Sequence, residues 1–134
     1  MSKIRIKALG EMITFAGRIA KKVAQPPKTI LLYGDLGTGK TEFARAFIRA
    51  KLGDPNLVVP SPTFTIVQNY NGISHFDLYR IKSAAELYEI GFFDAIQNDI
   101  VLIEWSERGE RFLPKSAIHI NIELDGDERI ITIS

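Results

Sequence analysis

Residues 34–41, with the sequence G-D-L-G-T-G-K-T, constrain this chain more than any other stretch. They match the pattern of glycine, four residues, glycine, lysine and serine or threonine that forms a phosphate-binding loop. An apolar run at 29–33 precedes them, and a segment with helical periodicity at 42–48 follows them. Strand, glycine-rich turn and helix form the context in which this pattern binds phosphate. The alternative is a surface turn that is rich in glycine by chance.

The chemistry of the loop follows from its residue types. Glycines allow backbone N–H groups to curl around an anion without Cβ clashes. A helix that begins near Gly39 directs its free N–H groups and the positive end of its dipole to the same place. Lys40 can then reach the terminal phosphates, and the hydroxyl of Thr41 can contact a magnesium ion. The motif therefore predicts a nucleoside triphosphate site.

The composition is that of an ordinary globular protein. The chain has 134 residues, of which 46% are hydrophobic and 25% charged, and we expect one domain over residues 1–134. The formal net charge of +1 gives no strong attraction to nucleic acid or to an anionic membrane. The absence of cysteine excludes disulfides, zinc thiolate sites and thiol catalysis. No signal peptide and no apolar run of about 20 residues is visible, so we expect a cytoplasmic protein.

The apolar periodicity along the chain predicts an α/β fold. The expected strands are 3–7, 29–33, 65–70, 73–79, 100–103, 117–123 and 129–133, and the expected helical segments are 12–23, 39–52, 83–90 and 92–96. Asn71-Gly72 forms a hairpin turn, since both residues accept positive φ. We expect a three-layer sandwich like that of P-loop NTPases. Its central sheet is mixed and mainly parallel, and an antiparallel hairpin is inserted into it.

Two carboxylates compete for the metal ion. Glu104 ends the run 100–103, whose β-branched and apolar residues are typical of a buried parallel strand. A carboxylate at that position can hold magnesium, and the alternative is a solvent-facing glutamate. Asp77 also ends a strand, but in an alternating hairpin strand. We therefore rank Asp77 second for the metal and first for orienting water, with a turn aspartate as the alternative.

Other polar segments give weaker predictions. Residues 61–65, S-P-T-F-T, are similar to loops that sense a γ-phosphate, although a proline-led loop entering a strand is the favoured interpretation. His75 is interpreted as a packed or hydrogen-bonded strand residue. Arg80 is interpreted as a surface residue rather than a phosphate contact. Trp105 is interpreted first as a core residue.

The order and spacing of five segments resemble a known family. They are L-L-Y-G-D-L-G-T-G-K-T, S-P-T-F-T, H-F-D-L-Y-R, E-L-Y-E-I-G and L-I-E-W-S-E, and the resemblance to the TsaE (YjeE) family covers nearly the whole chain. It implies a weak, magnesium-dependent ATPase required for threonylcarbamoyladenosine modification of tRNA, at the adenosine beside the anticodon. The implied partners are TsaB and the transferase TsaD, and tRNA is contacted mainly through that complex. No membrane partner is implied.

The resemblance also implies roles for individual residues. The residues implied to bind the phosphates are Asp35, Leu36, Gly37, Thr38, Gly39, Lys40 and Thr41. The implied magnesium ligands are Thr41 and Glu104. Asp77 and Trp105 are implied to lie beside them in the active site. The adenine lies between the start of the first helix, from Leu9 to Glu11, and Arg129 in the last hairpin.

The expected reaction is in-line attack of water on the γ-phosphate of ATP. The catalytic residues are Lys40, which neutralises charge, Glu104, which holds magnesium, and Asp77, which orients water. No arginine finger is assigned, and a partner could supply one or could order residues 61–65. The alternatives are a small P-loop kinase and a nucleotide-gated binding module with little turnover. A GTPase is disfavoured because the chain lacks an Asn-Lys-x-Asp segment.

Overall fold

The computed structural model describes residues 2–134, apart from the side chain of Arg108. The strands are β1 (Ser2–Ile6), β2 (Lys28–Tyr33), β3 (Val67–Tyr70), β4 (Ile73–Asp77), β5 (Ile100–Glu104), β6 (Ile118–Asp125) and β7 (Glu128–Ile133). The helices are α1 (Leu9–Lys22), α2 (Lys40–Leu52), α3 (Ala84–Glu89), α4 (Phe92–Asn98) and the 3-10 helix η1 (Ser106–Phe112). None of the helices in the described part of the chain is long and apolar enough to cross a membrane.

All seven of these strands form one sheet in the order β1-β7-β6-β2-β5-β4-β3. The four central strands, β6, β2, β5 and β4, pair in parallel, and the pairings at both ends of the sheet are antiparallel. The parallel centre and the antiparallel hairpin formed by β3 and β4 agree with the sequence prediction. Because β2 lies between β6 and β5, the phosphate-binding loop that follows it is at the middle of the sheet.

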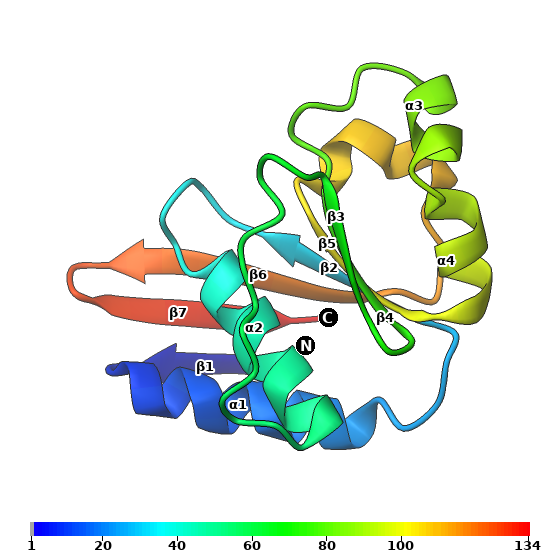
Figure 1. Cartoon of the computed structure of the whole chain (residues 1–134). Coiled ribbons are helices and arrows are strands. Elements are labelled where there is room, and N and C mark those ends of the chain that lie inside the picture. The colour runs from blue at the N-terminus through cyan, green and yellow to red at the C-terminus, as the bar shows by residue number, and fades with distance from the viewer. Residues whose placement is uncertain (1) are drawn as a thin grey trace.

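Helices cover both faces of the sheet (Figure 1). One buried cluster joins α1 and α2 to the sheet and includes Phe43, Phe47 and Leu102. The other cluster, which includes Phe76, Phe92 and Ile103, joins α3 and α4 to the opposite face. The three layers of the expected sandwich are therefore present, and the two cores are separated by the sheet itself.

Local signals in the sequence account for several element ends. The Ser83 side chain accepts a hydrogen bond from the backbone N–H of Glu86 and caps α3. Gly53, at φ 65°, ends α2, and the hairpin turn has Asn71 at φ 43° and Gly72 at φ 91°. These turns need positive φ, which glycine and asparagine accept at low cost.

The structure differs from the sequence prediction at several points: α1 begins at Leu9 rather than at 12, and β4 ends at Asp77 rather than at 79. The strand β3 begins at Val67 rather than at 65, because residues 62–65 form a turn. All five residues of β4 are buried, so this strand does not alternate. It pairs in parallel with β5 and thus belongs to the centre of the sheet, although it also forms one arm of the hairpin. The helix η1 follows Trp105, where no element was expected.

Candidate nucleotide site

The phosphate-binding loop connects the end of β2 to the start of α2. Its three glycines have positive φ: 146° at Gly34, 81° at Gly37 and 113° at Gly39. At Gly34 a Cβ atom would lie 2.5 Å from the backbone oxygen of Ile122 and 2.5 Å from the hydroxyl oxygen of Thr38. The loop conformation therefore requires glycine at residue 34, both for its φ and for space.

Lys40 is the first residue of α2, and its side chain is buried. Its Nζ donates a hydrogen bond to the carbonyl oxygen of Gly34 at 2.7 Å and lies 3.5 Å from the centre of the Trp105 ring. Burial lowers the pKa of Lys40, and nearby carboxylates, of which Glu104 has the largest effect, oppose this shift. Trp105 is thus half-buried against Lys40 rather than packed in either core, where it was first expected.

Glu104 and Thr41 meet beside Lys40. The Thr41 hydroxyl lies 3.0 Å from Oε1 and 3.1 Å from Oε2 of Glu104, and the Glu104 side chain is buried at the end of β5. A hydroxyl and a carboxylate are hard oxygen ligands of the kind that Mg²⁺ prefers. No cluster of three or more His, Asp or Glu side chains suited to a metal is found in the described part of the chain. This pair nevertheless fits Mg²⁺, which commonly takes one or two protein oxygens and fills its other positions with phosphate and water.

The carboxylate of Asp77 lies at the same edge of the sheet. Asp77 is the register partner of Glu104 across the parallel pairing of β4 with β5. It is buried, and its Oδ1 accepts a hydrogen bond from the backbone N–H of Tyr79 at 3.0 Å. Burial raises the pKa of Asp77, while hydrogen bonds from Tyr79 N–H and the Thr63 hydroxyl act in the opposite direction. Thr63 connects residues 61–65 directly to this carboxylate.

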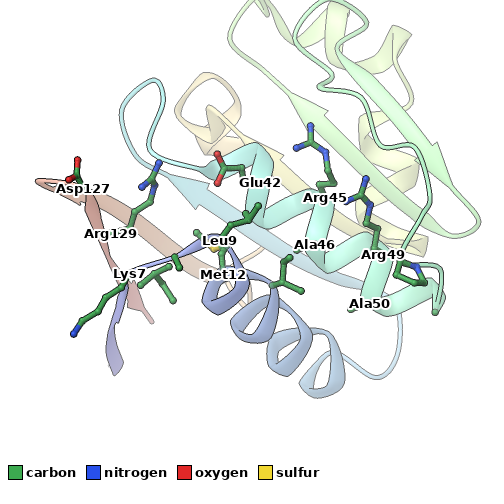
Figure 2. Close-up of a pocket in the computed structure, with 15 residues that line it drawn as sticks. Lys7, Leu9, Met12, Glu42, Arg45, Ala46, Arg49, Ala50, Asp127 and Arg129 are labelled. Atoms are coloured by element: carbon green, nitrogen blue, oxygen red, sulfur yellow. The ribbon is translucent and has the colours of Figure 1, made fainter.

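A cavity of about 780 Å³ adjoins the loop and extends along α2 (Figure 2). It lies between the start of α1, the outer face of α2 and the hairpin formed by β6 and β7. Leu9 and Arg129 both line this cavity, and Arg129 Nε donates a hydrogen bond to the carbonyl oxygen of Thr38 in the phosphate-binding loop. Glu11 does not line it, and its Oε1 instead accepts a hydrogen bond from the N–H of Lys7 at 3.3 Å.

A family model for "Threonylcarbamoyl adenosine biosynthesis protein TsaE" matches residues 6–131. The chain belongs to the TsaE family. The TsaE protein of Rickettsia conorii is 43% identical over 124 residues, which cover 87% of this chain and 70% of that protein. The TsaE protein of Haemophilus influenzae is 40% identical over 129 residues, covering 87% and 80% of the two chains. The crystal structure of Bacillus subtilis YdiB matches with a TM-score of 0.75 and 31% identity, over 98% of this chain and 83% of that one.

Within this TsaE-family chain, the structure brings together most of the residues that the sequence singled out. Lys40, Thr41, Glu104, Asp77 and Trp105 all lie where the central strands and α2 meet. Arg80 lies apart: its exposed guanidinium stacks 4.8 Å from the centre of the Phe64 ring, as expected of a surface residue.

The interpretation of His75 as a packed or hydrogen-bonded strand residue is confirmed, but the sequence did not indicate its partner. His75 is fully buried, and its Nε2 lies 2.7 Å from Oε2 of Glu104. One signal was available: His75 is two residues from Asp77, and alternate residues of a strand share a face, so the two side chains lie on the same side of the sheet. That signal could not identify Glu104 as the partner, since pairing of β4 with β5 was needed to bring the two side chains together.

Proposed function

We propose that this TsaE-family chain is a Mg²⁺-dependent ATPase of low intrinsic activity that acts with the TsaB–TsaD pair in the cytoplasm. Its role in the biosynthesis of threonylcarbamoyladenosine in tRNA follows from its family. The observation that carries the ATPase proposal is the convergence of Lys40, Thr41 and Glu104 at the phosphate-binding loop, with Asp77 one strand away.

The loop and α2 bind the phosphates. Backbone N–H groups of residues 35–41 surround the anion, and the N-terminus of α2 adds its dipole. Lys40 exchanges its contacts with the Gly34 carbonyl and the Trp105 ring for phosphate oxygens. This exchange is favourable because burial lowers the pKa of Lys40, and a nearby anion compensates for the lost hydration of the ammonium group.

The cavity beside the loop accommodates the nucleoside. Leu9 offers an apolar surface, and Arg129 is already anchored to the loop through the carbonyl of Thr38. The adenine lies between them, next to the phosphates. Glu11 was assigned to this subsite by resemblance, but its hydrogen bond to Lys7 directs it to the backbone before α1.

Hydrolysis requires a polarised phosphate and an oriented water molecule. Thr41 and Glu104 would hold the Mg²⁺, which would supply positive charge beside the phosphate oxygens. Asp77 accepts a hydrogen bond from the attacking water, and Tyr79 N–H and Thr63 fix the direction of its carboxylate. Orientation of this kind lowers the barrier without a covalent intermediate.

Residues 61–65 offer a route by which partners affect hydrolysis. The Thr63 hydroxyl contacts Asp77, and the next residue, Phe64, has 78% of its surface exposed. A protein that packs against Phe64 therefore also moves or fixes a ligand of the water-orienting carboxylate. We propose that TsaB–TsaD completes the site in this way.

The test is a reconstituted assay with TsaB–TsaD, tRNA, ATP and Mg²⁺. We expect slow release of phosphate by the isolated chain, a changed rate with TsaB–TsaD, and loss of tRNA modification with Lys40→Ala or Glu104→Ala. Wild-type levels of modification with either variant would contradict the mechanism. Equal hydrolysis rates with and without TsaB–TsaD would contradict the proposed coupling, and transfer of phosphate to a metabolite would indicate a kinase.

A further inference from the structure

The hydrogen bond between His75 and Glu104 has no role in the mechanism above, although it is the most deeply buried contact of the site. His75 has 0% of its surface exposed and Glu104 has 3%. A buried carboxylate needs hydrogen-bond partners, because loss of its hydration is otherwise costly. Thr41 and His75 supply these partners from two different elements, α2 and β4.

The sheet determines how the two side chains meet. On β4, His75 and Asp77 are two residues apart and share the face that α2 covers. On the neighbouring strand β5, Glu104 pairs with Asp77, so its side chain must lean along the strand to reach His75. The contact joins His75 Nε2 to Oε2 of Glu104 at 2.7 Å, and the Thr41 hydroxyl lies 3.0 Å from Oε1 and 3.1 Å from Oε2.

These contacts fix the rotation of the carboxylate. His75 contacts Oε2 from the interior, and the Thr41 hydroxyl lies within 3.1 Å of both oxygens, so the carboxylate is held between β4 and the start of α2. Outer contacts of this kind orient metal-binding carboxylates in many proteins. We propose that His75 is a positioning residue that holds Glu104 in the orientation in which it binds the Mg²⁺ of the nucleotide complex. This inference rests on the proposed function.

The chemistry of imidazole suits this task. A carboxylate oxygen accepts hydrogen bonds, so Nε2 of His75 is the donor in this contact. Nδ1 of His75 has no hydrogen-bond partner in the described part of the chain. Its polar role is therefore confined to Glu104. A lysine or arginine in this place would neutralise the carboxylate that the metal requires.

The experiment compares His75→Gln with His75→Leu. Glutamine can place an amide N–H near the position of Nε2, whereas leucine has similar bulk and no donor. Trp105 is the only tryptophan of the chain and contacts Lys40, so its fluorescence reports nucleotide binding. The dissociation constant of ADP is measured with Mg²⁺ and with EDTA for each variant. The control is His119→Leu, because His119 is the other histidine and stacks on Tyr33.

We expect Mg²⁺ to tighten ADP binding by the wild type and by the control. In His75→Leu the tightening by Mg²⁺ falls by about 10-fold to 100-fold, while the dissociation constant in EDTA stays within about twofold. His75→Gln restores most of the tightening. If His75→Leu does not fold, His75→Asn takes its place, because its shorter amide reaches only the position of Nδ1.

Three results would overturn the inference. The first is the same Mg²⁺ effect in His75→Leu as in the wild type. The second is an equal loss of binding with Mg²⁺ and with EDTA in both His75 variants, which indicates a purely structural role. The third is a wild type that binds ADP with the same dissociation constant in Mg²⁺ and in EDTA. Only this result also removes the basis of the proposed function.

Discussion

Asp77 and Glu104 show how neighbouring residues of one type acquire different roles. They end adjacent parallel strands and are register partners. Glu104 contacts Thr41 and His75, both of which suit a metal-binding carboxylate. Asp77 contacts Tyr79 N–H and Thr63, and burial raises its pKa. Environment rather than residue type thus separates the proposed metal ligand from the proposed water-orienting group.

The raised pKa of Asp77 predicts a pH-dependent effect of Asp77→Asn on stability. The folded chain holds this proton more tightly than the unfolded chain, whose carboxyl titrates near 3.8. The resulting stability is present below that value and is lost as pH rises through the higher folded pKa. Asparagine does not titrate, so the Tm of the variant minus that of the wild type increases between about pH 4 and about pH 8.

Thermal unfolding of nucleotide-free protein at the two pH values measures this difference. The control is Asp127→Asn, which changes an exposed carboxylate. A difference for Asp77→Asn that stays constant or decreases with pH would show that the buried carboxylate is not destabilised by its surroundings.

At the scale of elements, α2 links the phosphate-binding loop to the segment that follows the helix. Arg45 Nε donates a hydrogen bond to the carbonyl of Val59 at 3.0 Å, and Arg49 Nε donates one to the carbonyl of Leu57 at 2.9 Å. These contacts hold the chain before residues 61–65 against the helix that begins at Lys40. The nucleotide loop and the loop that reaches Asp77 are therefore both anchored to α2.

The loop before α2 predicts unequal effects of two glycine substitutions. Gly34→Ala and Gly37→Ala both place alanine at positive φ, at a cost of about 1–3 kcal/mol. Only at Gly34 would the new Cβ lie 2.5 Å from a backbone oxygen, whereas at Gly37 nothing lies within 4 Å. We expect Gly34→Ala to lower the free energy of unfolding by at least about 1 kcal/mol more than Gly37→Ala does. Urea unfolding measures both, and equal losses would refute the clash.

At the scale of the whole molecule, the C-terminal strand completes the sheet that carries the site. The strand β7 lies between β1 and β6, so the two ends of the chain pair directly. Ile131 is fully buried and is the register partner of Ile4 on one side and of Ile122 on the other. It belongs to the same core cluster as α1 and α2, so packing at the chain ends supports the helices beside the cavity.

Removal of this side chain tests that support. We expect Ile131→Ala to lower the free energy of unfolding by about 2–5 kcal/mol, because a buried isoleucine leaves a cavity in a core with little freedom to collapse. The control is Ile130→Ala, on the opposite face of β7 and partly exposed, which should cost clearly less. Urea denaturation compares the two variants, and similar losses would show that the chain ends contribute little to the core.

Much of the fold was predictable because its signals are local. Periodicity over a few residues gave the strands and helices, and glycine at required positive φ located the loop and turns. The buried run before Glu104 also indicated the central strand β5, which carries the proposed metal ligand. The alternating pattern assigned to β4 was wrong, since its second face is covered by α3 and α4, which lie later in the chain.

The sequence by itself determined the glycine-rich loop at 34–41 and the carboxylates that end strands near it. These properties depend on neighbouring residues, whose backbone geometry and polar groups act over a few ångströms. Only the tertiary structure decided that β6 lies beside β2, that His75 holds Glu104, and that Arg129 from β7 reaches the loop. Such contacts join residues far apart in the chain, and they form because burial of both sheet faces selects one strand order.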